Sequence, residues 1–217
     1  MVKFQAVFFD LDGTLADTAV QLGLALNLQR ERHGLEPLAA EIIRPYASHG
    51  TRGLLELGFG FSLEHPDFEA YRLEYLAIYD DVFLQNPQLF DGMAEVLTAI
   101  ETHGLKWGVV TNKPRRFTMP LMQALGLHQR AAAIVSADDC ERPKPYPDTL
   151  LLACELVGVA APACVYVGDA ERDIEAGLAA AMQTIIAMYG YLDMRDTPET
   201  WGANATIATP LGFLGLL

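Results

Sequence analysis

Short apolar runs that end in polar residues recur along this chain of 217 residues. Their length and composition are typical of buried strands in a parallel sheet. Between them lie stretches with helical spacing of apolar residues. The runs cover residues 6–9, 107–110, 133–135, 164–167 and 184–187, and the helical stretches cover residues 93–103, 114–125, 146–156 and 173–181. Strands that alternate with helices in this way predict an α/β fold with a doubly wound parallel sheet.

The stretch from residue 17 to residue 87 breaks this alternation. It has helical patterns and no evident strand-like run, over residues 18–33, 38–47, 51–57 and 66–84. Tyr71, Tyr75 and Tyr79 recur at helical spacing and predict packing within this part of the chain. We therefore expect a core of residues 1–16 and 88–217 and an inserted small helical cap domain of residues 17–87. Because the cap follows the first strand directly, we expect it to lie over the end of that strand.

Composition excludes several other classes of protein. The chain is 51% hydrophobic, which is enough for a core and a smaller cap. It has no apolar stretch of about 18 residues and no secretory leader, so we expect no membrane partner and no export. Three cysteines without a C-x-x-C pair favour a cytoplasmic protein over a disulfide framework. A net charge of −13 argues against nucleic acid as a partner.

Two carboxylates stand two residues apart where the first predicted strand ends. On an extended backbone Asp10 and Asp12 point the same way, about 6.6 Å apart at roughly 3.3 Å per residue. Both can therefore face one small ligand. Gly13 and Thr14 follow, and they let the backbone turn with N–H groups free to bind an anion. A strand that simply ends in turn-forming residues is the alternative.

Polar residues at other strand ends extend this group. Ligands bind beyond the carboxyl ends of the strands in such a sheet, so we expect Asp10, Asp12, Thr111 and Asp169 to share one pocket. Together with Asp173 these acids form an oxygen-rich set that suits Mg²⁺. Asp173 is expected to bind the ion or to orient a water bound to it. Capping of the helix that begins there is the alternative role of Asp169 and Asp173.

A lysine and two neutral polar residues complete the predicted site. Lys144 lies between two prolines, which stiffen the backbone and aim its ammonium group. We expect it to neutralise charge around the nucleophile and on a phosphoryl group, with an exposed turn lysine as the alternative. Thr111 and Asn112 offer a hydroxyl and an amide to phosphate oxygens, although Thr-Asn also closes strands for turn reasons.

These segments, in this order and at these spacings, resemble the signature of the haloacid dehalogenase superfamily of phosphatases. The matching motifs are Asp10-x-Asp12-Gly-Thr-Leu, Thr111 after a strand, Lys144 in Lys-Pro-x-Pro-Asp, and Gly168-Asp169-x-x-x-Asp173. The resemblance implies a Rossmann-like core with a helical cap inserted after the first motif. It also implies a Mg²⁺-dependent phosphatase.

The same resemblance assigns roles to the predicted site residues. Asp10 would be the nucleophile that forms an aspartyl-phosphate. Asp12 would protonate the leaving alcohol and then activate water. Thr111 and Lys144 would bind the phosphoryl group, and Mg²⁺ would sit on Asp10, the carbonyl of Asp12, and Asp169.

Two groups within the superfamily are similar to this chain. Thr111-Asn112-Lys113-Pro114 resembles the phosphoglycolate phosphatases. Residues 107–127, with Tyr189–Tyr191 and Trp201–Ala203 in the tail, are closer to the N-acetylmuramic acid 6-phosphate phosphatases of bacterial cell-wall recycling. The implied substrate is a small phosphate monoester, first N-acetylmuramic acid 6-phosphate and alternatively phosphoglycolate. A sugar phosphomutase is a further alternative, although we identify no added cap base for it. A non-catalytic metal-binding module is another, although no signature residue is missing.

Polar residues near the predicted pocket are candidates for choosing the substrate. Residues 48–52 form a predicted loop between two cap helices, in which His49 and Arg52 are the main candidates. Arg52 could pair with the carboxylate that both substrates carry. Lys113 and Arg116 would add positive charge near the phosphate end, whereas Arg115 is expected at the surface. A solvated turn is the alternative for residues 48–52.

Overall fold

A six-stranded parallel sheet forms the centre of the protein. The structure is a computed structural model that describes residues 4–217. The strand order is β3-β2-β1-β4-β5-β6, with β1 (Ala6–Phe9), β2 (Lys106–Val110), β3 (Ala133–Val135), β4 (Cys164–Gly168), β5 (Gln183–Ala187) and β6 (Ala205–Ile207). The first strand has β2 on one side and β4 on the other. The strand order reverses at this point, so a ligand site is expected beyond the end of β1.

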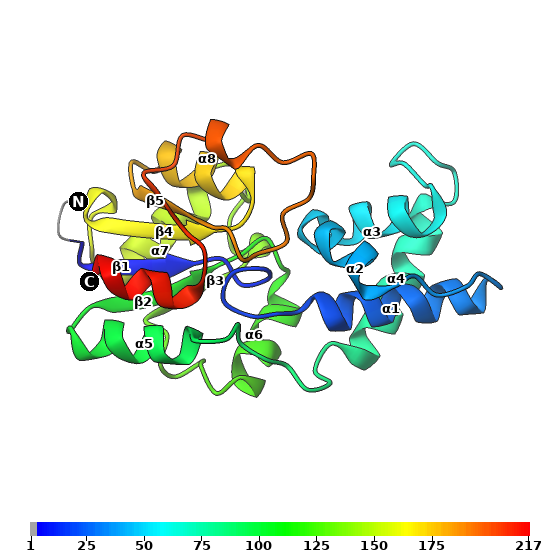
Figure 1. Cartoon of the computed structure of the whole chain (residues 1–217), viewed down its shortest axis with the longest axis horizontal. Coiled ribbons are helices and arrows are strands. Elements are labelled where there is room, and N and C mark those ends of the chain that lie inside the picture. Colours follow the sequence, from blue (N-terminus) through cyan, green and yellow to red (C-terminus); the bar gives the residue numbers. More distant parts are fainter. Residues whose placement is uncertain (1–3) are drawn as a thin grey trace.

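Helices cover both faces of the sheet (Figure 1). Val7 and Phe9 of β1 pack into the cluster on the side of α5 (Met93–Thr102) and α6 (Arg115–Ala124). Ala6 and Phe8 belong to the cluster on the opposite side, with α7 (Asp148–Val157) and α8 (Glu171–Ala179). Alternate residues of a buried strand thus serve two cores, as the apolar runs predict. The predicted α/β fold is confirmed.

One strand of the sheet was not predicted from the sequence. β6 comprises only Ala205–Ile207 and pairs with β5 at the edge of the sheet. Three residues, of which only Ile207 is buried, give too short a pattern to stand out from a loop. The prediction of five strands is therefore one strand short.

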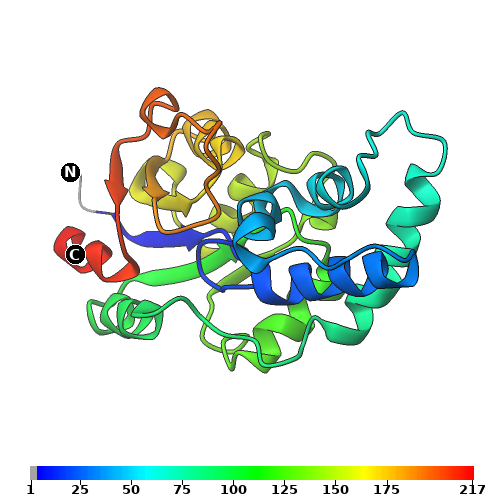
Figure 2. The same cartoon turned by 45° about the vertical axis from the view of Figure 1, so that its right-hand side comes forward.

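The helical part of the chain gathers at the carboxyl ends of the strands, to the right of the sheet in Figures 1 and 2. Its helices pack on one another around buried residues such as Leu26, Leu54 and Tyr75. They are α1 (Ala19–Arg32), α2 (Ala40–Ile43), a 3-10 helix (Arg44–His49), α3 (Gly50–Phe59) and α4 (Phe68–Val82). The predicted loop at residues 48–52 is wrong, because the 3-10 helix extends to residue 49 and α3 begins at residue 50.

Two neighbouring crossings join the helical part to the sheet. Ala16 and Leu89 form an antiparallel bridge, and the Asp17 N–H donates to the Gln88 carbonyl at 3.0 Å. The predicted boundaries, residues 17 and 87, are next to these crossings in the sequence, and the division into two domains stays a prediction. Phe117 and Tyr191 of the core belong to the apolar cluster of the helical part, so the two parts also pack against each other.

Two further sequence expectations concern cysteines and membranes. The three cysteines, Cys140, Cys154 and Cys164, are free thiols. Within residues 4–217, no helix combines the length and apolar character that crossing a bilayer requires.

Candidate active site

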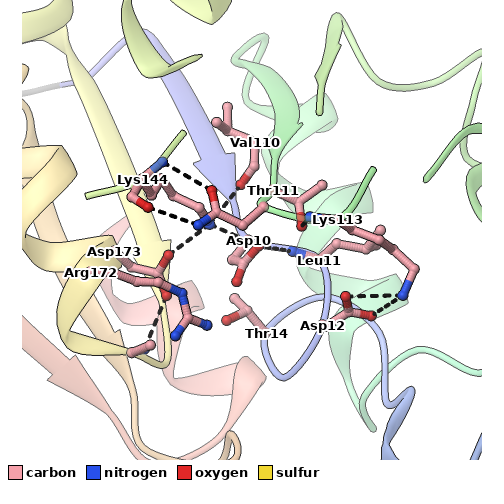
Figure 3. Close-up of polar contacts among 12 residues, drawn as sticks. Asp10, Leu11, Asp12, Thr14, Val110, Thr111, Lys113, Lys144, Arg172 and Asp173 are labelled. Atoms are coloured by element: carbon pink, nitrogen blue, oxygen red, sulfur yellow. Dashed lines mark hydrogen bonds and ion pairs between the residues drawn. The ribbon is translucent and has the colours of Figure 1, made fainter. Parts of the chain in front are cut away.

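Asp10 lies buried at the carboxyl end of β1, at the edge of the sheet where the strand pattern predicts the site (Figure 3). Its Oδ1 accepts the Leu11 N–H at 2.7 Å and lies 3.0 Å from Lys144 Nζ. Burial raises the pKa of this carboxyl group, and the opposing effect of Lys144 does not cancel that rise. Since both contacts use Oδ1, the second oxygen is left to face a ligand.

Lys144 is the cation that contacts Asp10, and its side chain is fully buried. Nζ reaches Asp10, lies 2.7 Å from Asp173 Oδ1 and donates to the Tyr166 hydroxyl at 2.7 Å. Asn112 fixes the backbone of Lys144, because its Nδ2 donates to the Lys144 carbonyl at 2.8 Å and its Oδ1 accepts the Lys144 N–H at 3.0 Å. The Asn112 amide therefore positions Lys144, and its second N–H is left for the predicted phosphate contact.

Three buried acids gather in one place. Ligand oxygens of Asp10, Asp169 and Asp173 all lie within 4.8 Å of one another. Burial, with the negative charges of Asp173 and Asp10, raises the pKa of Asp169 to about 7. For Asp173, Lys144 and Arg172 outweigh burial and lower the pKa. Three buried carboxylates close together need cations, and hard oxygen ligands of this kind fit Mg²⁺.

Local contacts hold two of these acids in place. Asp169 accepts the Thr14 hydroxyl at 3.3 Å and the Tyr191 N–H at 2.8 Å. Asp173 accepts the Ala170 N–H at 3.0 Å, so it also caps α8. Asp173 thus has the helix-capping role given above as the alternative, and it also belongs to the acidic group. The Asp12 side chain is not part of that group among the described residues.

Asp12 instead forms a second polar cluster, which includes residues of the helical part. Both of its carboxylate oxygens lie 3.1 Å from Lys113 Nζ, and Oδ1 accepts the Thr18 hydroxyl at 2.6 Å. Lys113 Nζ also donates to the Tyr79 hydroxyl of α4 at 2.8 Å. Burial alone would lower the pKa of Lys113, but Asp12 and Tyr79 outweigh it and raise that pKa. Lys113, which was predicted to help choose the substrate, therefore forms an ion pair with Asp12.

A cavity of about 560 Å³ lies over Asp10, between the part built on the sheet and the helical part. The part built on the sheet contributes Asp10, Asp12, Thr111, Asn112, Lys113, Arg116 and Phe117, and the helical part contributes Leu22, His49, Thr51, Arg72, Tyr75, Leu76 and Tyr79. The structure thus brings together the predicted nucleophile, the predicted acid and Thr111. It also shows that two of the tyrosines expected to pack within the cap line this cavity.

The predicted substrate-selecting residues do not all face this cavity. Arg52 lines a neighbouring hollow of about 420 Å³, whereas the preceding residues 48–51 line the cavity over Asp10. His49 borders both spaces, and its Nε2 lies 3.5 Å from Asp193 Oδ2. Arg116 does line the cavity, 3.6 Å from Asp80. Arg115 pairs with Asp139 at the surface, as predicted.

Two residues of the site were not found from the sequence. Arg172 lies between Asp169 and Asp173 in the sequence. It donates to the Ser48 carbonyl at 2.8 Å and to the Ser48 hydroxyl at 3.1 Å, so it joins the acidic group to the helical part. The Tyr191 hydroxyl accepts the N–H groups of Thr18 and Ala19 at 2.7 and 2.9 Å, where α1 begins. The similarity noted at Tyr189–Tyr191 was the available signal for Tyr191, whereas no motif marked Arg172.

Comparison with known proteins identifies the family. The profile of the haloacid dehalogenase-like hydrolases matches residues 7–187. The chain belongs to this family. The hydrolase is 40% identical over 216 residues to the N-acetylmuramic acid 6-phosphate phosphatase of Pseudomonas aeruginosa, covering 100% of this chain and 96% of that protein. It is 39% identical over 206 residues to the phosphoglycolate phosphatase of Xanthomonas campestris pv. campestris, covering 95% and 93%.

A solved structure supports the fold of the hydrolase. The structure described as a predicted phosphoglycolate phosphatase from Haemophilus somnus superposes with a TM-score of 0.84 at 22% identity, covering 100% of this chain and 99% of that one. The hydrolase is thus an α/β protein of the haloacid dehalogenase type. Family and relatives together make it a phosphoric monoester hydrolase.

Proposed function

We propose that this hydrolase removes the phosphate group of N-acetylmuramic acid 6-phosphate. The observation that carries the proposal is the cavity of about 560 Å³ over Asp10, which is of the size that proteins use for ligands larger than phosphoglycolate. Its wall includes Leu22, Tyr75 and Leu76, apolar and aromatic side chains suited to the faces of a sugar ring. Phosphoglycolate phosphatase is the second candidate, favoured by the relative at 39% identity.

Asp10 is the nucleophile in this proposal. Its Oδ1 is held by Leu11 and Lys144, so the other oxygen attacks phosphorus. A bond forms between Asp10 and phosphorus as the bond from phosphorus to the sugar oxygen breaks, which yields an aspartyl-phosphate. Lys144 stabilises the negative charge on the phosphoryl oxygens, and Thr111 at the cavity wall offers its hydroxyl to them.

Asp12 acts first as the general acid and then as the general base in this proposal. It first gives a proton to the departing sugar oxygen and then takes one from the water that attacks the aspartyl-phosphate. The Asp12 carboxylate is oriented from both parts of the protein, by Lys113 and by Thr18 at the start of the cap. Tyr79 holds Lys113 from the cap side. Lys113 and Tyr79 are thus positioning residues, because they act through Asp12.

Mg²⁺ is the metal that we propose for the acidic group. Asp10 and Asp169 would hold it, with the carbonyl of Asp12, and Asp173 would bind it or orient a water bound to it. When bound, the ion neutralises negative charge on the phosphoryl group. The buried carboxylates within 4.8 Å of one another support this assignment.

We also propose a role for residues 17–87. As a cap they cover the substrate and choose it, while the core carries out chemistry shared by many phosphatases. The reaction would take place in the cytoplasm, during recycling of bacterial cell-wall sugars.

Substrate ranking tests this function. N-acetylmuramic acid 6-phosphate, phosphoglycolate and glucose 6-phosphate are compared at equal concentration with Mg²⁺, and kcat/KM is obtained from released phosphate. We expect the amino-sugar phosphate to be preferred by about 10-fold or more, the discrimination that a few kcal/mol of pocket contacts provides. A preference for phosphoglycolate would overturn the proposal, and so would an isomeric sugar phosphate formed without free phosphate.

A further inference from the structure

One face of α4 forms a wall of the cavity. Arg72, Tyr75, Leu76 and Tyr79 are three and four residues apart, so they lie on the same side of the helix, and all of them line the cavity. Tyr79 stands at the end where Lys113 pairs with Asp12. At 1.5 Å per residue, Arg72 stands about 10.5 Å further along the helix axis. From Tyr79 to Arg72, this wall therefore leads away from the place where the ester bond breaks.

Arg72 is held at the outer end of this wall by one acid. Its Nε and Nη2 donate to the two carboxylate oxygens of Glu69, each at 2.7 Å. Glu69 lies one turn earlier on α4 and is 62% exposed, whereas the Arg72 side chain is 37% exposed. A guanidinium group has five N–H donors, so this pair leaves donors of Arg72 free to bind a second anion. A second carboxylate at the rim of the cavity can use them.

Other cations around the cavity are placed differently. Lys113 is paired with Asp12, and Arg172 donates to Ser48. Arg116 follows Lys113 by three residues on the core side, where its guanidinium group lies 3.6 Å from Asp80 of α4. Asp80 is the neighbour of Tyr79, so Arg116 belongs to the same end of α4 as Asp12. Arg72 is the cation at the opposite end of the α4 wall.

We propose that Arg72 binds a carboxylate on the part of the substrate remote from the phosphate, which makes phosphorylated sugar acids the preferred class. This inference rests on the proposed function. In N-acetylmuramic acid 6-phosphate the sugar ring and the lactyl ether separate the ester from the carboxylate, so the molecule can extend along Tyr75 and Leu76. In phosphoglycolate the carboxylate is attached to the carbon that bears the ester oxygen. It cannot reach Arg72 while its phosphate is at Asp10.

The variant Arg72→Gln tests the inference with two substrates. N-acetylglucosamine 6-phosphate has the same ring, acetamide and phosphate as N-acetylmuramic acid 6-phosphate but carries a hydroxyl in place of the lactyl ether. We expect Arg72→Gln to lower kcat/KM for the sugar acid by about 10- to 100-fold, mainly through KM, which is the range for losing hydrogen bonds to a charged group. For N-acetylglucosamine 6-phosphate kcat/KM should stay within about twofold of wild type.

Arg52→Gln is the matched control, because Arg52 is a cap arginine that lines the neighbouring hollow. It should leave both substrates unaffected. Glutamine is a good helix former, so Arg72→Gln is expected to fold, and circular dichroism checks this. If wild type prefers the sugar acid and Arg72→Gln keeps that preference, or loses both activities equally, the inference fails and the proposed function stands. If wild type itself does not prefer the sugar acid over phosphoglycolate, the proposed function fails, and the inference with it.

Discussion

The floor and the roof of the cavity are built in opposite ways. The floor consists of Asp10, which lines the cavity, and of Lys144 and Asp173 next to it; all three are at most 3% exposed, and Lys144 contacts both acids. On the roof, the side chains of His49 and Arg72 are 38% and 37% exposed, and their partners are acids outside this group. Exposed ion pairs contribute little to stability, whereas breaking a buried pair is costly. The roof can therefore change its residues at small cost, while the floor cannot.

This contrast predicts that floor variants affect every substrate alike and that roof variants affect substrates selectively. The largest effect is expected for Asp10→Asn, because an amide cannot act as the nucleophile. We expect kcat to fall by about 10⁴-fold or more on each phosphate ester, in the range seen when a nucleophile is removed. Phosphate release under single-turnover and steady-state conditions measures this.

A matched control for Asp10→Asn is Asp81→Asn, an exposed carboxylate on α4. It should keep the wild-type kcat. Both proteins are compared by thermal unfolding, so that loss of fold is separated from loss of chemistry. A folded and active Asp10→Asn protein would show that Asp10 is not the nucleophile. The predicted difference between floor and roof variants would then fail.

The next effect concerns the acidic group. Removing Mg²⁺ by chelation, or substituting Asp169→Asn, should lower kcat by about 100-fold or more, since the ion contributes several kcal/mol of charge stabilisation. The same binding should stabilise the fold by about 2.7 kcal/mol when Mg²⁺ is at 100 times its Kd. The thermal unfolding midpoint of wild type should therefore rise with Mg²⁺, and that of Asp169→Asn should not. Equal stabilisation of the two proteins would place the ion elsewhere.

Much of the floor was predictable, because a parallel sheet brings the ends of its strands to one edge. Asp10, Thr111 and Asp169 each follow an apolar run, and the fold class alone places them near one another. Contacts between distant segments were not predictable. Asn112 fixes the backbone of Lys144, 32 residues away, and Arg172 reaches Ser48, 124 residues away. Neither partner can be deduced from local pattern.

The roof was harder to predict for a different reason. Helical spacing shows which residues share a face of a cap helix, but the direction in which that face points depends on tertiary packing. Arg52 and Arg72 are both cap arginines. The structure turns Arg72 toward the cavity over Asp10 and Arg52 toward the neighbouring hollow. Of residues 48–52, named from the sequence as substrate-selecting, residues 48–51 line the cavity.

A third prediction concerns the boundary between floor and roof. Lys113→Met should lower kcat by about 10- to 100-fold on all substrates, because Asp12 loses the cation that orients it. Tyr79→Phe removes one hydrogen bond to Lys113 and keeps the ring, so a loss of about 10-fold or less is expected. Steady-state kinetics on two or more esters measures both. A larger loss for Tyr79→Phe than for Lys113→Met would mean that the tyrosine acts on the substrate directly.

The smallest effects are expected from two glycine substitutions, one in each region, measured as unfolding free energy in urea. In Gly190→Ala the new Cβ would lie 2.2 Å from Asp169 Cβ and 2.6 Å from the Gly13 carbonyl, so Asp169 must shift. Such overpacking costs about 1–3 kcal/mol, and the shift should also weaken Mg²⁺ binding. Gly60 ends α3 at φ +74° with no atom within 4 Å of a new Cβ, so Gly60→Ala should cost about 1 kcal/mol from backbone strain alone and leave Mg²⁺ binding unchanged. Equal effects of the two variants on Mg²⁺ binding would show that the floor is no more tightly built than the roof.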